Sequence, residues 1–308
     1  DFEQNPYWIQ NRIQSKDARI RLLLSLSANL KVTDWLTLQA RGNLDYSADK
    51  LRQKFYASTA TALCGMNGRY IEMDYQETQM YGDVMAMVKK QLNDFTLDVA
   101  IGGSINDRIT NSTRIDSKNA SLKYANVFNL ASIVMSSSAS IDQKIDAHYQ
   151  LQSVFATAQI GYKEGVFLDL TARNDWSSTL AYTKYEKKGF FYPSVGVSFL
   201  PDKWVKMPEW VSFSKLRGAY SIVGNGVPPF ITYPVSYVTA GGEILASDAA
   251  PFAEMKPEMT HSVELGMEWK FLQHRLGLNL TYYRPDTYEQ FFKLPALAGD
   301  KYAYRYVN

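Results

Sequence analysis

Regular alternation between apolar and polar side chains over residues 147–176 is the feature that most limits how this chain can fold. Two arms flank a short turn at 163–165, and Phe155 is the exception on the polar side of the first arm. The apolar positions are Val154, Ala156, Ala158, Ile160, Val166, Leu168, Leu170 and Ala172, and the polar ones include Ser153, Thr157, Gln159, Asp169, Thr171 and Arg173. Successive side chains of a strand point to opposite faces. The stretch therefore predicts a β-hairpin with one apolar and one wet face.

The same period of two recurs along the chain and predicts about ten strands. They are expected at 18–32, 36–49, 69–91, 95–114, 147–162, 166–176, 194–199 and 213–225, with two further arms inside 257–292. Four connections are short (33–35, 93–94, 163–165, 272–275), and four are long (50–68, 115–145, 177–188, 226–256). The intermediate connection at 201–212 is long enough for a short helix, and residues 5–17 are predicted as a turn followed by a polar stretch.

Short turns at one end and long loops at the other are typical of outer-membrane β-barrels. Mean hydropathy is -0.27, and no apolar run reaches the ~18 residues of a membrane-spanning helix. A barrel strand, however, shows lipid only at every second residue. Aromatic residues make up 14% of the chain, and many fall near predicted strand ends, as interfacial girdles require. The predicted fold class is therefore all-β, an antiparallel transmembrane β-barrel. A soluble β-rich binding or adhesin module is the alternative, and it predicts extraction without detergent.

Charge and reactive residues argue against several other classes of protein. The formal charge of +2 comes from 33 basic and 31 acidic residues, so the chain lacks the basic excess that nucleic acid requires. The single cysteine, Cys64, and three scattered histidines give neither a disulfide nor a metal-ligand spacing. No nucleophile, base and orienting group converge, and the glycines at 224–226 are too few to cradle a phosphate. We expect no enzyme activity, no catalytic residue, no metal and no cofactor.

Six blocks of sequence resemble the SusC-like branch of TonB-dependent outer-membrane transporters. They are Asn5-Pro6-Tyr7-Trp8, Thr33-Asp34-Trp35-Leu36 with Arg41, residues 168–180 around Arg173-Asn174-Asp175-Trp176-Ser177-Ser178, Phe191-Tyr192-Pro193-Ser194-Val195-Gly196, Lys215-Leu216-Arg217-Gly218-Ala219-Tyr220 with Gly224-Asn225, and Lys256-Pro257-Glu258. The blocks follow the family order across nearly the whole chain. The block around Asp175 is the most specific.

This resemblance implies energy-coupled import of an oligosaccharide or peptide across the bacterial outer membrane. It also implies a SusD-like surface lipoprotein as a lid, contact with TonB, and outer-membrane lipid around a 22-stranded barrel. Residues 1–308 are expected to be part of a single β-barrel domain. The plug domain, the TonB-contacting segment and the remaining strands are expected outside this sequence. A passive porin is the alternative in the same membrane.

Two groups of residues are candidates for substrate binding. Arg173, Asn174, Asp175 and Trp176 end a strand on the loop side, where charged and aromatic groups can meet an oligosaccharide or peptide. The alternative for them is a hydrogen-bond network inside the barrel that holds a loop. The loop aromatics Tyr182, Tyr185, Tyr233 and Tyr237 form the second group, because tyrosine rings stack on sugars. Anchoring at the membrane interface is the alternative for these four.

Overall fold

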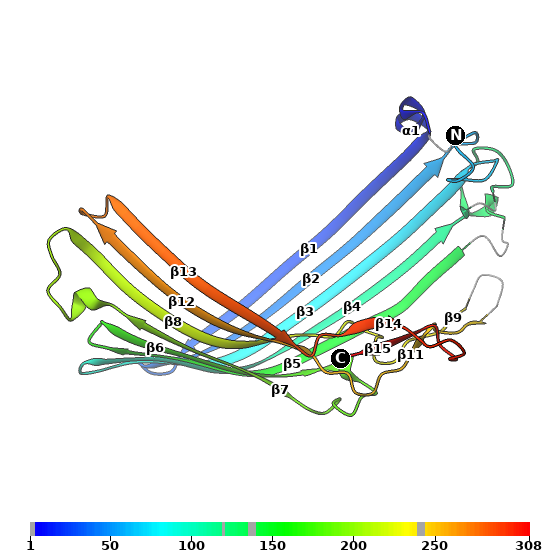
Figure 1. Ribbon diagram of the computed structural model, residues 1–308. Coiled ribbons are helices and arrows are strands. Elements are labelled where there is room, and N and C mark those ends of the chain that lie inside the picture. Colours follow the sequence, from blue (N-terminus) through cyan, green and yellow to red (C-terminus); the bar gives the residue numbers. More distant parts are fainter. Residues whose placement is uncertain (1–3, 119–120, 135–139, 239–243) are drawn as a thin grey trace.

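Ten strands form one antiparallel sheet in the computed structural model, which describes residues 4–118, 121–134, 140–238 and 244–308, without the side chains of 140–146 and 237. Each strand pairs with its neighbour in the order β1-β2-β3-β4-β5-β6-β7-β8-β12-β13. The bounds are β1 (Ile13–Lys31), β2 (Leu36–Phe55), β3 (Arg69–Leu92), β4 (Phe95–Asp116), β5 (Ser140–Tyr162), β6 (Val166–Ser177), β7 (Phe190–Phe199), β8 (Val211–Asn225), β12 (Glu258–Phe271) and β13 (Leu276–Tyr288). Figure 1 shows this sheet as a curved trough. The predicted all-β class and strand number are confirmed.

The connections are sorted by length, as the sequence predicts. All the short ones lie at one end of the trough, and the long ones lie at the other (Figure 1). Left-handed backbone closes the tight turns, with φ of 50° at Asn93 and of 48° and 53° at Lys163 and Glu164. The intermediate connection between β7 and β8 contains a 3-10 helix, η4 (Pro201–Lys203). The short end is thus the periplasmic side and the long end the extracellular side of a barrel.

The structure differs from the prediction at several element ends. Helix α1 (Pro6–Arg12) replaces the expected turn and polar stretch, because the Asn5 side chain accepts a hydrogen bond from the Tyr7 N–H and Pro6 occupies the first turn. In the described part of the chain no helix has the length and apolar character to cross a membrane. Strands β1, β2 and β5 extend further toward the loop end than predicted. Both faces meet water there, so the alternation that marks a strand is lost.

Short elements also occur within the long loops, where none was predicted. They are η2 (Leu130–Ser132), η3 (Ser178–Leu180), β9 (Tyr237–Val238), β10 (Ile244–Leu245) and β11 (Ala249–Ala250), and beyond β13 lie β14 (Phe292–Pro295) and β15 (Tyr304–Val307). Strands β9 and β10 pair with each other, and β11, β15 and β14 form a small sheet. Much of the 115–145 loop is described, but the positions 119–120 and 135–139 are outside the described residues.

One face of the main sheet is apolar from strand to strand. A single cross-strand row contains Leu97, Ile160, Leu168, Val197, Gly218, Leu265 and Tyr282. Side chains on this face are exposed rather than packed in an interior, with 63% exposure at Val84 and 56% at Leu265. On β1 the apolar positions run from Ile20 to Leu30, which matches the ~9–11 residues that a strand needs to cross a bilayer. We call this the outer face.

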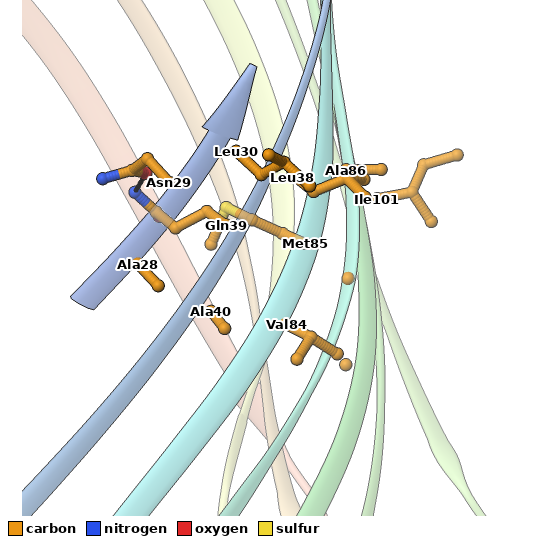
Figure 2. Close-up of a pocket in the computed structure, with 12 residues that line it drawn as sticks. Ala28, Asn29, Leu30, Leu38, Gln39, Ala40, Val84, Met85, Ala86 and Ile101 are labelled. Carbon is orange, nitrogen blue, oxygen red and sulfur yellow. Dashed lines mark hydrogen bonds between the residues drawn. The ribbon is translucent and has the colours of Figure 1, made fainter. Parts of the chain in front are cut away.

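Aromatic side chains gather where the outer face meets the short turns. Phe95, Tyr162 and Trp204 form a chain of rings with centroid separations of 4.7 and 5.6 Å. Trp210, Phe271 and Trp269 form a second one, at 5.7 and 6.1 Å. Such rings belong at a membrane–water interface. A hollow of about 520 Å³ lies in the nearby apolar face, where small residues such as Ala28 and Ala40 stand beside Leu30, Leu38 and Ile101 (Figure 2).

The buried hydrophobic residues of the described chain lie in the long loops and at the strand ends beside them, such as Ile71 and Phe190. One cluster joins Tyr70, at the start of β3, to Leu122 and Ile133 from the loop that follows β4. A second cluster contains Leu180, Phe190, Val227 and Met255, with Tyr185, Tyr192, Ile231, Phe252, Phe291 and Tyr306 packed around them. The long loops are therefore folded units with cores of their own. Cys64 is buried in the first loop, and burial raises the pKa of its thiol.

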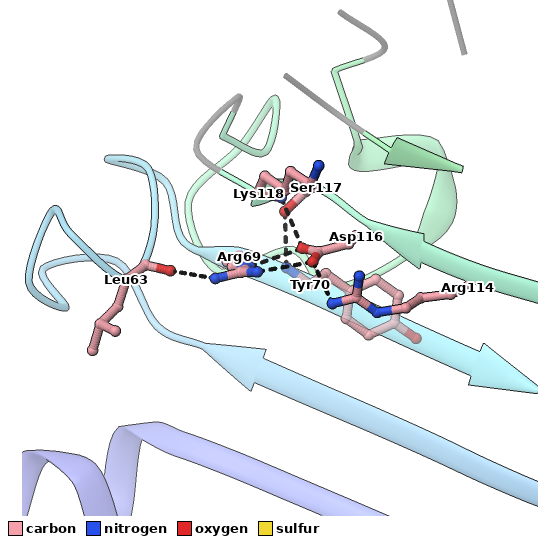
Figure 3. A network of polar contacts seen from close by, with 7 residues as sticks. All are labelled: Leu63, Arg69, Tyr70, Arg114, Asp116, Ser117 and Lys118. Carbon is pink, nitrogen blue, oxygen red and sulfur yellow. Dashed lines mark hydrogen bonds and ion pairs between the residues drawn. The ribbon is translucent and has the colours of Figure 1, made fainter. Parts of the chain in front are cut away.

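A buried ion network holds the first two long loops together (Figure 3). Arg69 donates two hydrogen bonds of 2.8 Å to Asp116 and a third, of 2.9 Å, to the carbonyl of Leu63. Arg114 donates to the same carboxylate at 2.7 Å, and so does the Lys118 N–H at 2.9 Å. Burial acts to raise the pKa of Asp116, but the Arg69 and Lys118 hydrogen bonds and the nearby positive charges outweigh it and hold the pKa below its usual value.

The two-faced sheet predicts opposite responses at adjacent residues of β6. We expect Leu170→Arg, on the outer face, to lower the free energy of unfolding by about 2–4 kcal/mol because it places a charge in hydrocarbon. The matched control Thr171→Arg points to the other face and is expected to have little effect. Chemical unfolding of the intact protein in lipid vesicles measures both. Equal losses at the two positions would contradict the assignment of faces.

The ion network predicts a pH-sensitive loop. Asp116→Asn leaves Arg69 and Arg114 without their carboxylate, and we expect the free energy of loop opening to fall by about 3–5 kcal/mol. Because the pKa of Asp116 is lowered in the folded state, its contribution is present above ~pH 4 and is lost as the pH falls through the folded pKa. Hydrogen exchange over residues 57–68 measures this. Asp34→Asn, in a turn where Asp34 is 98% exposed, is the control and should change nothing.

Candidate functional site

The face opposite the apolar one is polar and lined by ion pairs, and we call it the inner face. The pairs are Arg19–Asp49, Arg21–Asp45, Arg41–Asp83, Arg108–Glu77 and Arg217–Glu264. They bridge neighbouring strands because their members share the inner side of the pleat. The Asp83 side chain is fully buried against Arg41 at 3.0 Å. The alternation in the sequence thus produces a polar inner face on which each of these arginines pairs with a carboxylate.

The first group of candidates is divided between the two faces. Arg173 and Asp175 are on the inner face, where Arg173 donates to Asp175 at 2.7 Å and to the Ser153 hydroxyl at 2.7 Å. This is the arrangement of the internal network that the sequence offered as the alternative. Asn174 and Trp176 lie in register with Val154 and Gln152 and so share the outer face. The period of two places these neighbours on opposite sides, so the structure does not bring the four candidates together.

Two of the loop tyrosines come together, whereas a third is packed inside its loop. The rings of Tyr182 and Tyr233 lie 5.1 Å apart and are inclined by 39°, and their exposures are 73% and 55%. Tyr185 instead packs against the second hydrophobic cluster and meets Phe190 edge-on at 6.3 Å. Tyr237 is in β9, and its side chain is outside the described part of the chain. Tyr182 and Tyr233 therefore form the exposed aromatic surface of this loop unit.

A cleft of about 490 Å³ lies between the inner face and the loop that follows β8. The wall contributes Tyr75, Arg108 and Tyr149, and the loop contributes residues 225–229, with Pro228 and Pro229 at its end. Val227 holds this loop in place because it is buried in the second cluster. We call this space the wall–loop cleft.

A smaller polar hollow of about 220 Å³ adjoins the cleft through the shared residue Tyr75. Its lining consists of Arg19, Arg21, Asp45, Ser47, Asp49, Tyr75 and Glu77. The Tyr75 hydroxyl donates to Glu77 at 2.7 Å, and burial together with this hydrogen bond raises the pKa of Tyr75. Tyr75 is therefore a neutral donor over the physiological range, held in one orientation.

The cleft offers groups suited to binding a polar organic solute. Phenol rings supply flat apolar surface, and a guanidinium and the Asn225 amide supply hydrogen bonds. Among the described residues no group of three His, Cys, Asp or Glu side chains is placed to hold a metal ion. Sequence reasoning missed this site. Tyr75, Arg108 and Tyr149 follow inner-face alternation, but nothing in the sequence indicates that the loop after β8 lies against β3–β5.

Comparisons with known proteins agree with this architecture. The family model for the TonB dependent receptor-like β-barrel matches residues 1–308. No curated protein matches the chain. The solved RagAB peptide transporter superposes with a TM-score of 0.80 at 17% identity, covering 98% of this chain and 33% of that one. The siderophore receptor PiuA from Acinetobacter baumannii gives 0.56 at 13%, with 94% and 42% covered, and FpvA of P. aeruginosa gives 0.56 at 12%, with 94% and 36% covered.

The chain spans about one third of the length of the RagAB chain that it matches. At these identities the solved structures establish the fold alone, and the family model, which covers the whole chain, establishes the family. The predicted recognition of a TonB-dependent outer-membrane barrel and its predicted location are confirmed. The chain belongs to the TonB-dependent receptor-like β-barrel family, and its strands lie in the bacterial outer membrane.

Proposed function

We propose that this chain is the part of an active importer that forms a wall of the transport passage and an extracellular binding surface. The wall–loop cleft carries this proposal, because it opens on the polar inner face at the extracellular end. In this position it can hold a solute on its way into the barrel. The related structures support the class of function, since one is described as a peptide transporter and another as a siderophore receptor.

The cargo that best suits the cleft is an oligosaccharide or a peptide. Both classes combine flat apolar segments with many hydrogen-bonding groups, which tyrosine rings, an arginine and an amide recognise together. The role is binding and passage, without catalysis. We place a SusD-like lipoprotein lid over the exposed Tyr182–Tyr233 pair, because aromatic side chains exposed on ordered loops are typical of interfaces.

We also propose that the ten strands are one section of a larger barrel, within a single domain. Strands β1 and β13 are the two edges of the main sheet. Unpaired backbone groups cannot face hydrocarbon, so both edges require partner strands in the membrane. The plug and the TonB-contacting segment then belong to the rest of the full-length protein.

Energy dependence separates this proposal from the passive porin. We expect uptake of fluorescent peptide and oligosaccharide mixtures by cells expressing the full-length protein to fall at least about tenfold when TonB is deleted, because release of cargo from an occupied cleft needs work. That factor corresponds to ~1.4 kcal/mol. Uptake that persists without TonB would indicate a porin. Release of the protein from membranes by a salt wash alone would instead indicate the soluble module.

One tyrosine and one tryptophan on opposite faces of the sheet test the cleft itself. We expect Tyr149→Ala in the full-length protein to weaken cargo binding about tenfold, since it removes a ring from the cleft wall at ~1.4 kcal/mol. Trp176→Ala is the matched control, because Trp176 lies on the outer face. Binding isotherms of the purified protein measure both variants. A loss at Trp176 with none at Tyr149 would move the binding site away from the cleft.

A further inference from the structure

The backbone pairing between β7 and β8 is short and stops below the loop end of both strands. It covers six residue pairs and ends at Ser194 and Ser221. The next residue of β7 toward the loops is Pro193, which has no N–H for a further ladder hydrogen bond. Above this point β7 pairs with β6 alone, up to Phe190, and β8 pairs with β12 alone, up to Asn225. The sheet is therefore divided between β7 and β8 at its extracellular end.

The ring of Tyr192 joins the two sides of this division. Tyr192 stands opposite Arg173 of β6, and Gly224 of β8 stands opposite Met259 of β12. The ring nevertheless lies directly on Gly224, because a Cβ atom at position 224 would overlap Cε1, Cζ and the hydroxyl oxygen of Tyr192. Tyr192 also packs against the second hydrophobic cluster, so its ring is held in place. Glycine is therefore the residue that fits at 224.

This contact lies immediately before the loop segment that lines the wall–loop cleft, which is residues 225–229. The Asn225 amide donates a hydrogen bond of 3.3 Å to Glu258 on β12, and Val227 is buried in the second cluster. The ring on Gly224 is a third point of attachment for the same segment. Because β7 gives the segment no backbone hydrogen bonds, its placement on that side depends on side-chain packing.

We propose that Tyr192 and Gly224 are positioning residues for cargo binding, because their contact sets where residues 225–229 stand against the wall of the cleft. A binding site requires its groups to be held within about 0.5 Å of the productive geometry by packed supporting residues. The inference rests on the proposed function for its effect on cargo. It also gives a role to two of the sequence blocks, around Tyr192 and Gly224, from which no candidate binding residue was drawn.

A double-mutant cycle in the purified full-length protein tests the contact, with binding isotherms for fluorescent peptide and oligosaccharide mixtures. We expect Gly224→Ala to weaken binding at least about tenfold, because the added methyl group drives the loop away from the ring, and Tyr192→Leu to weaken it about threefold. The double variant Tyr192→Leu/Gly224→Ala should bind no more weakly than Tyr192→Leu, because leucine leaves room for the methyl group. Additive losses of about thirtyfold, or unchanged binding by Gly224→Ala, would overturn the inference.

Gly277→Ala is the matched control for the glycine replacement. Gly277 is in β13 beside the short turn at 272–275, and a Cβ atom there would meet no other atom within 4 Å. We expect this variant to bind cargo like the unmodified protein. A loss equal to that of Gly224→Ala would show a general effect of replacing glycine in the sheet and would overturn the inference.

Hydrogen exchange without cargo separates this inference from the proposed function. We expect the amides of residues 225–227 to exchange at least about tenfold faster in Gly224→Ala, and the double variant to match Tyr192→Leu. Unchanged exchange in Gly224→Ala would overturn the inference. The expected exchange, combined with cargo binding that neither Tyr149→Ala nor Gly224→Ala alters, would support the positioning of the loop and overturn the cleft as the cargo site.

Discussion

Every backbone N–H and C=O that enters hydrocarbon must be paired within the protein, and this requirement organises the molecule. An antiparallel meander meets it with nearest-neighbour strands alone, as in the order β1 to β8 followed by β12 and β13. Once the backbone is paired, the side chains are free to face two different solvents. The apolar row through Leu97 and Leu265 and the ion pairs of the opposite face both follow from that freedom.

Outside the hydrocarbon the backbone no longer has to be paired within the protein, and buried loop cores contribute stability instead. The strands continue past Ile20 on β1 and Met80 on β3 toward the loop end, where water can satisfy the backbone. There the loops acquire ordinary protein cores, around Tyr70 and Leu122 in one case and Leu180 and Met255 in the other. A buried carboxylate, Asp116, then links strand ends to loops. The described parts of these loops are therefore held by buried side chains and not by strand pairing alone.

The alternation of apolar and polar residues is the sequence feature that predicts the fold, because it indicates which side chains meet lipid. It predicted the strands, the short turns and the division between faces. The alternation does not predict structure outside the membrane, where both faces are polar. Strand β5 therefore begins at Ser140 and not at 147, and helix α1 depends on a local cap at Asn5. The same alternation also predicts that Asn174 and Arg173 lie on opposite faces of β6. It does not predict the cleft, because a loop that packs through Val227 against its neighbours has no periodic sequence pattern.

The two faces of the sheet differ in how they balance charge, and the difference follows from what each face meets. Hydrocarbon tolerates no charge, so the middle of the outer face has none. The inner face is polar, and unpaired arginines on it would attract anions from water; Arg21 and Arg41 are instead matched to Asp45 and Asp83.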